Sequence, residues 1–207
     1  MAEQLLKKVG YGQVEKNRIQ GIRAGRVLAD LPVNPEVVKS SGDRIENGMF
    51  LDAVYGKGFE GNLKTGQLEL PTAQSKNVGL VYSEVKLYSE YTSNKDFALF
   101  TVNPSINQMR QAPIYDKKEA PKATVIPRLI FPTPGDIFTT NLIETADGAL
   151  PEVGTTLKLN AKGILSTAGT LDVVIAQVVQ KTTMPDGQVA AKLAIVEVNP
   201  AATVAGA

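Results

Sequence analysis

Two pairs of acidic side chains lie close together in the sequence and are the first candidates for chemistry. Asp43 is followed by Glu46, and Glu144 is followed by Asp147. Two facing carboxylates about 5–9.5 Å apart can act as acid and base in glycoside hydrolysis, and acidic loops can bind Ca²⁺. The chain has no D-x-[DN]-x-[DN]-G loop, however, and sequence spacing does not establish facing carboxylates. We therefore interpret these residues as ordinary solvated loop charges.

Several residue types on which enzymes commonly depend are missing. The 207-residue chain contains no Cys, no His and no Trp. Without His there is no Ser–His–Asp triad and no imidazole metal ligand. Without Cys there is no disulfide, thiol nucleophile or thiolate zinc site. Carboxylate, Lys and Tyr chemistry stay open, but we expect a protein that is not an enzyme and that uses no cofactor or metal.

Two glycine-rich stretches resemble phosphate-binding loops at first sight. They are GYGQ at 10–13 and GKGFEG at 56–61. Neither fits G-x-x-x-x-G-K-[ST], and the G-x-G-x-x-G in the second is followed by no helical pattern and lies in no βαβ unit. Turns explain both stretches better than a phosphate site does.

The main concentration of aromatic side chains lies in the middle of the chain. It comprises Tyr82, Tyr88, Tyr91, Phe97 and Phe100. A binding face for sugar or protein is one interpretation, but core and cross-strand packing is the more common use of such residues.

Positive charge concentrates at the start of the chain, although the whole chain has a net charge of only +1. Residues 1 to 28 carry six basic side chains against Glu3 and Glu15, a local excess of four. The basic residues are Lys7, Lys8, Lys16, Arg18, Arg23 and Arg26. Frequent glycines disfavour a helix here, because each one lowers helix stability by about 1 kcal/mol relative to Ala. We expect residues 1–40 to form an extended basic arm that lies outside the β core and is ordered by a partner.

The six basic residues are our candidates for partner binding. Tyr11 is the only aromatic residue before Phe50, so the region has few side chains that could stack on nucleic-acid bases. We therefore expect a protein partner and not nucleic acid, with a plain solvated tail as the remaining alternative.

The composition of the whole chain is typical of an all-β protein. It has 18 Gly, 12 Pro and 43% apolar residues, which favours short strands joined by many turns. We expect a small β-barrel, β-tulip-like or sandwich domain together with the extended N-terminal arm. The expected boundaries are an arm at 1–40, a β segment at 41–102, a linker or long loop at 103–122, a C-terminal β domain at 123–198, and a frayed tail at 199–207.

Two strand-and-turn patterns are clear enough to predict individual elements. Asn47-Gly48 predicts a turn before an apolar strand at Met49–Val54. Further on, Leu171–Val179 and Val189–Val198 read as two strands of a hairpin, joined across the Pro-Asp-Gly turn at 185–187.

The chain shows no signal for membrane insertion or export. The opening MAEQLLKKVGYG lacks the apolar core of a signal peptide. No stretch approaches the roughly 18 apolar residues of a membrane span. We expect a protein made in the cytosol, with no membrane partner.

A series of strand and turn signals runs through residues 134–198. It comprises Gly135-Asp136 at the start, the G-x-x-L-x-L strand at 154–159, the turn at 161–163, the apolar strand around Val174–Val178, and the Asp-Gly hairpin into the last strand. This series resembles the small β domain of tailed-phage head decoration (cement) proteins. The chain departs from the pattern at Ala176, where Gly is frequent, and it is longer than the simplest members. The resemblance implies a β-tulip or barrel domain, often trimeric, that binds the outside of an icosahedral shell and stiffens it.

These observations lead to one expected function with two alternatives. We expect a structural virion protein on the capsid surface, made in the host cytoplasm, that binds the major capsid protein as a homo-oligomer, with a trimer implied by the resemblance. Its contacts would be non-covalent and multivalent, with the six basic arm residues forming part of them. The alternatives are a phage neck, tail or head-fibre component, and a β-sandwich module that binds glycan or protein at a bacterial surface.

Overall fold

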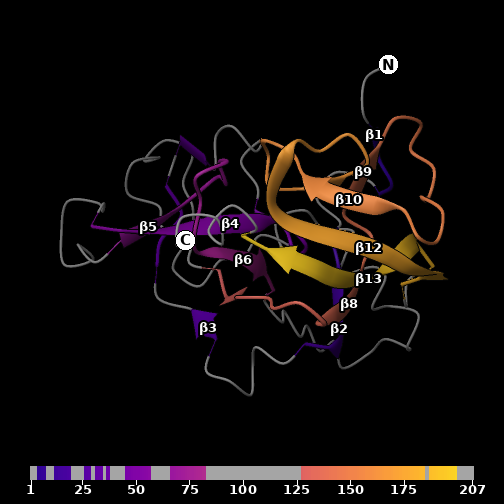
Figure 1. Ribbon diagram of the computed structural model, residues 1–207, viewed down its shortest axis with the longest axis horizontal. Coiled ribbons are helices and arrows are strands. Elements are labelled where there is room, and N and C mark those ends of the chain that lie inside the picture. Colours follow the sequence, from indigo (N-terminus) through magenta and orange to yellow (C-terminus); the bar gives the residue numbers. More distant parts are fainter. Residues whose placement is uncertain are drawn as a thin grey trace, which may run out of the picture.

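The computed structural model describes residues 4–7, 12–19, 26–28, 31–34, 36–37, 45–56, 66–82, 127–184 and 187–199. Within these residues the regular elements are the strands β1 to β13, arranged in two sheets (Figure 1). The prediction of an all-β protein is therefore confirmed. In the described part of the chain the sheets do not close into a barrel, so the barrel alternative is wrong and the sandwich alternative is the consistent one.

The larger sheet has eight strands in the order β1-β9-β11-β10-β12-β13-β8-β2. Its strands are β1 (Gln4–Leu5), β9 (Ile143–Thr145), β11 (Leu165–Ser166), β10 (Thr156–Leu159), β12 (Leu171–Thr183), β13 (Val189–Val198), β8 (Ile137–Thr140) and β2 (Val14–Arg18). All neighbouring pairs are antiparallel except β9 and β11, which are parallel.

The smaller sheet has five strands in the order β3-β7-β6-β4-β5. They are β3 (Val27–Leu28), β7 (Leu129–Ile130), β6 (Val78–Val81), β4 (Phe50–Tyr55) and β5 (Gly66–Glu69). The turn at Asn47-Gly48 precedes β4 as predicted, and Gly48 has a φ of 97°, which favours glycine.

The β12–β13 hairpin is the longest feature of the fold, and the sequence prediction for it is confirmed. The register runs from Val174 opposite Val198 to Thr183 opposite Val189, with two irregular steps along the ladder. On β13, Leu193 and Ile195 are buried while Ala194 between them is partly exposed. This alternation is the two-residue period of a strand with one face on the core.

Two side chains tie the sheets together in the core. The rings of Phe50 on β4 and Phe138 on β8 lie 6.4 Å apart with an interplanar angle of 62°. Both are almost fully buried, in a cluster of apolar side chains drawn from both sheets. The edge-to-face arrangement suits the quadrupoles of the two rings, so it adds to the free energy gained from burial.

The turn before β8 explains the Gly135-Asp136 pair. Pro134 and Gly135 occupy the middle of a turn in which Asp136 N–H donates to the carbonyl oxygen of Thr133 at 3.0 Å. Gly135 has a φ of 92°, as the third position of a type II turn requires. The Asp136 carboxylate accepts a hydrogen bond from Thr133 N–H at 2.9 Å, which closes the turn from the side-chain side.

The expectation that residues 1–40 lie outside the core is wrong for the described part of that region. Leu31, Val33 and Val37 are buried in a core cluster with residues of the smaller sheet. The strands β1 and β2 form the two edges of the eight-stranded sheet, and β3 forms an edge of the five-stranded sheet. The physical reason is that sheet edges offer unpaired backbone groups, with which short extended segments between the glycines can pair. The expected linker at 103–122 and tail beyond Asn199 lie outside the described residues.

Candidate functional site

The six basic residues proposed for partner binding differ in their placement and contacts. Lys7, Lys16, Arg18 and Arg26 are described, whereas Lys8 and Arg23 lie outside the described residues. Lys7, Lys16 and Arg26 are engaged within the chain itself. Their placement as partner contacts stays a prediction, and the contacts below define what each one can do.

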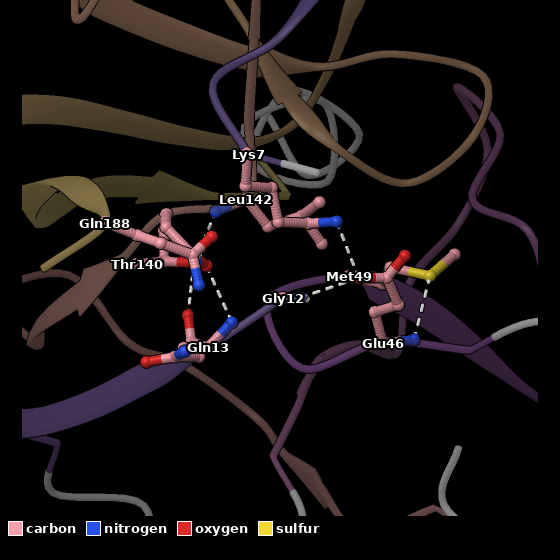
Figure 2. Close-up of polar contacts among 9 residues, drawn as sticks. Lys7, Gly12, Gln13, Glu46, Met49, Thr140, Leu142 and Gln188 are labelled. Atoms are coloured by element: carbon pink, nitrogen blue, oxygen red, sulfur yellow. Dashed lines mark hydrogen bonds and ion pairs between the residues drawn. The ribbon is translucent and has the colours of Figure 1, made fainter. Parts of the chain in front are cut away.

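Lys7 is buried in an ion pair with Glu46. Its Nζ lies 2.6 Å from Glu46 Oε2, and the lysine side chain is fully buried. The same oxygen accepts a hydrogen bond from Gly12 N–H at 2.7 Å, while Glu46 N–H donates to the sulfur of Met49 at 3.3 Å (Figure 2). One carboxylate thus holds the chain at both ends of the connection formed by residues 8–11. We call Lys7, Gly12, Glu46 and Met49 the Glu46 site.

The interpretation of the acidic pairs as solvated loop charges is wrong for Glu46 and Glu144. Both are buried, at 7% and 4% exposure. Asp147 is exposed and accepts a hydrogen bond from Ala149 N–H at 3.0 Å, in keeping with a loop charge. Asp43 lies outside the described residues. The two buried carboxylates are tolerated because each faces a lysine and further hydrogen-bond donors.

Glu144 anchors the turn that follows β10. Lys162 Nζ lies 3.1 Å from Glu144 Oε1, and Asn160 donates its side-chain amide to the other carboxylate oxygen. The Asn160 side-chain oxygen accepts backbone N–H groups of Lys162 and Ile164 at 2.9 and 3.0 Å. These bonds shape the turn, and the carbonyl oxygen of Gly163 accepts Phe50 N–H at 2.7 Å from the other sheet. The cluster therefore joins the sheets.

A second polar cluster lies beside the Glu46 site, at the turn between β8 and β9. Asn141 is fully buried, and its side-chain oxygen accepts Gln13 N–H at 2.6 Å while its amide donates to Gln188 at 3.3 Å. Thr140 donates its hydroxyl to the carbonyl oxygen of Gln13 at 2.7 Å. This cluster of Gln13, Thr140, Asn141 and Gln188, which we call the Asn141 hub, fixes the start of β2 and the tip region of the β12–β13 hairpin.

Two other basic residues of the predicted set also contact their own chain. Lys16 Nζ lies 4.5 Å from the centre of the Tyr82 ring, which joins an edge strand of the larger sheet to the end of β6. Arg26 lies 3.6 Å from the buried carboxylate of Asp136. Such contacts hold β2 and the segment before β3 against the rest of the fold.

Arg18 is placed differently, because it is exposed at the end of β2, an edge strand. It is opposite Ile137 of β8, which in turn is opposite Ala194 of β13. A second row, two residues along β8, contains Glu15, Thr139 and Lys192. Between these rows Phe138 and Leu193 are buried in the core, so the two rows lie on the other, outer face of the sheet. On that face Thr139 is itself buried, and its hydroxyl donates to the side-chain oxygen of Asn17 at 2.6 Å.

Both polar clusters hold segments of their own chain together. In the described part of the chain, no group of three or more acidic, His or Cys side chains is placed to hold a metal ion. No helix among those residues is long and apolar enough to cross a membrane. The four residues of the Glu46 site and the four of the Asn141 hub are a set of donors and acceptors that hold backbone segments in place.

Sequence reasoning missed the importance of Glu46 and Asn141. Glu46 belongs to one of the two acidic pairs and stands next to the predicted Asn47-Gly48 turn, and neither signal shows that it is buried. Asn141 follows a run of two threonines, with nothing local to show its burial. No known family model, no curated protein and no solved structure matches this chain.

Proposed function

We propose that the protein is a structural virion protein that binds and stabilises the shell of a phage head, as a decoration (cement) or minor capsid protein. It acts on the capsid surface as a homo-oligomer, through non-covalent contacts with the major capsid protein, and it catalyses no reaction. Multivalent binding lets weak single contacts add up, because after the first contact the others form at a high effective concentration.

One structural observation supports this proposal above the others. The segments that resemble decoration proteins are separate in the sequence, yet they form four adjacent strands, β10-β12-β13-β8, of one sheet. The Gly135-Asp136 turn leads into the last of these strands, and the turn at 161–163 docks on the other sheet through Gly163. The resemblance therefore follows one continuous structural unit.

We assign to the shell the outer face of that unit together with the adjoining edge strand β2. It carries Arg18 and Lys192 in its two rows, with the partly exposed Ile137 and Ala194 beside Arg18. An ordered sheet face with a few basic side chains suits an acidic, flat protein surface better than it suits a cavity-bound ligand. Of the four predicted arm residues that the structure describes, Arg18 is the one whose exposure best fits a direct contact.

The test is co-sedimentation of the purified protein with purified phage heads, followed by counting of bound copies. Saturable binding with a copy number close to that of the shell protein supports the proposal. A copy number of about one ring of subunits per phage particle would contradict the proposal and favour a neck or tail component. Absence of binding to heads, together with binding to isolated polysaccharide, would replace it by the glycan-binding alternative.

A further inference from the structure

The loop after β9 contains an Asp-Gly pair, Asp147-Gly148, at the protein surface. Ala146, Asp147 and Ala149 are exposed, and Gly148 is partly exposed. Exposed loop tips of small and polar residues are where a fold tolerates local change most readily. A change of local conformation at this pair therefore disturbs little packing.

An Asp-Gly sequence is able to modify itself through its own backbone. The glycine nitrogen forms a bond to the aspartate carboxyl carbon, and its proton leaves with the carboxyl OH group as water. Water then opens the resulting five-membered succinimide. Opening at the former side-chain carbonyl restores aspartate, whereas opening at the main-chain carbonyl gives isoaspartate, in which the backbone runs through the former side chain. Glycine favours the first step because it has no Cβ to obstruct the approach.

The contacts of Asp147 leave both reacting groups accessible. Its Oδ1 accepts Ala149 N–H at 3.0 Å, which holds the carboxyl group against the backbone of its own loop. Gly148 N–H, the group that must attack, donates to no acceptor in the described part of the chain. The nitrogen and the carboxyl carbon thus lie in one short exposed loop, and ring closure breaks no hydrogen bond of the nitrogen.

The Asn47-Gly48 turn is the opposite case. Asparagine closes the same ring with release of ammonia, and in an unfolded chain it does so faster than aspartate, because an ionised carboxylate is a poor electrophile. Here Gly48 is buried, and its N–H donates to the carbonyl oxygen of Val81 at 3.0 Å. A Cβ at Gly48 would lie 2.8 Å from Thr140 Oγ1, so the turn is tightly enclosed. Ring closure at this pair requires local opening of the fold.

We propose that Asp147-Gly148 is a modification site, at which the folded protein converts aspartate to isoaspartate without an enzyme, while the fold protects Asn47-Gly48. The order of reactivity that the sequence alone would give is thereby reversed. The chain has a third pair of this kind, Asp186-Gly187, but Asp186 lies outside the described residues, so the comparison depends on the first two.

The modification changes a loop that lies against β1. Gln4 is directly opposite Thr145, and a Cβ at Gly148 would lie 3.1 Å from Gln4 Oε1. The Thr145 hydroxyl donates to the carbonyl oxygen of Ala149 at 3.1 Å across the loop. Isoaspartate adds one main-chain atom between Thr145 and Ala149, so the loop has to rearrange beside the N-terminal strand.

Prolonged incubation of the folded full chain at body temperature tests the proposal. The buffer is mildly acidic, because the carboxyl group reacts in its protonated form. A parallel sample is incubated in guanidinium chloride that unfolds the protein. Peptide mapping by mass spectrometry then follows both pairs. Electron-transfer fragmentation distinguishes isoaspartate from aspartate of the same mass, and the mass gain from amide to acid marks conversion of Asn47.

We expect isoaspartate at position 147 to exceed conversion of Asn47 several-fold in the folded protein, and the order to reverse in denaturant. Asp147→Glu is the matched control, because it keeps the charge but would have to close a slower six-membered ring, so its peptide should stay unmodified. Asp172 supplies a second control, since it is exposed but is followed by Val173.

Two results would overturn the proposal. One is conversion of Asn47 as fast as that of Asp147 in the folded protein, and the other is no more isoaspartate at position 147 than at Asp172. The measurement uses purified protein alone, so its failure is separate from a failure to bind phage heads.

Discussion

Lys7 and Glu46 meet inside the protein, with 2.6 Å between Nζ and Oε2 and no exposure of the lysine side chain. Removing either side chain of such a buried ion pair takes from the other charge its ion-pair partner inside the protein, which is costly. The N-terminal segment is therefore a fixed part of the fold in the described structure and not a loose basic tail.

Removing one partner of this pair should destabilise the protein far more than removing both. We expect Lys7→Met or Glu46→Gln alone to lower the free energy of unfolding by about 3–5 kcal/mol. The double variant Lys7→Met/Glu46→Gln should lie within about 1 kcal/mol of the starting protein, because no charge is left buried and Gln can still accept Gly12 N–H. Urea denaturation of all four proteins gives the cycle. Additive losses would show that the two side chains act separately.

Gly163 should be harder to replace than other glycines with positive φ. It has a φ of 72°, and a Cβ there would lie 2.2 Å from the carbonyl oxygen of Phe50. Gly163→Ala strains the backbone at a positive φ and also forces the turn to move away from β4. We expect the second effect to lower the free energy of unfolding by about 1–3 kcal/mol beyond the first. Gly154→Ala is the matched control, with a φ of 92° and no atom within 4 Å. Equal melting temperatures for the two variants would contradict the close contact.

The aromatic pair between the sheets should couple energetically. Phe50 and Phe138 are each almost fully buried, so Phe→Leu at either position loses packing and the edge-to-face contact. We expect a coupling free energy of about 0.5–1.5 kcal/mol in a double-mutant cycle measured by chemical denaturation. A coupling free energy of zero would mean that each ring stabilises the protein only through its own burial.

Asn141 should control the attachment of β2. Asn141→Ala leaves Gln13 N–H without its 2.6 Å acceptor, so we expect a loss of about 1–3 kcal/mol and faster hydrogen exchange of the Gln13 amide. Gln188→Ala removes the longer 3.3 Å contact to the same side chain but leaves the Gln13 N–H bond to Asn141 in place, so it should cost less. If Gln188→Ala cost as much as Asn141→Ala, the hub would depend on the hairpin and not on β2.

Reversing the charge of Arg18 should weaken head binding without weakening the fold. Arg18 is exposed, so Arg18→Glu should change the free energy of unfolding by no more than about 0.5 kcal/mol. The amount of Arg18→Glu that co-sediments with heads should be lower than that of the unchanged protein. This difference should become smaller as salt is added, because salt screens the charge interaction. Lys76→Glu, exposed next to the smaller sheet, is the control and should bind as the unchanged protein does. Equal losses at both positions would point to net charge and not to a defined contact face.

Local sequence patterns were sufficient for the elements whose partners are near in the chain. The Pro-Asp-Gly turn between Leu171–Val179 and Val189–Val198 predicts the hairpin, and β12 and β13 pair as expected. Asn47-Gly48 predicts the turn before β4. These features depend on backbone conformations that only a few residue types favour and on alternation along one strand, and both can be read without knowing the rest of the fold.

The tertiary structure alone decided what the charged residues of the N-terminal region do. The sequence shows that Lys7 is basic and Glu46 is acidic, but not that they meet, because a buried ion pair depends on which backbone segments the fold brings together. The same holds for Glu144 with Lys162 and for Arg26 with Asp136. By itself the sequence determined the all-β class and the local turns. Burial and pairing of charge came from contacts between distant segments, where the cost of desolvating one group is offset only by a partner that folding supplies.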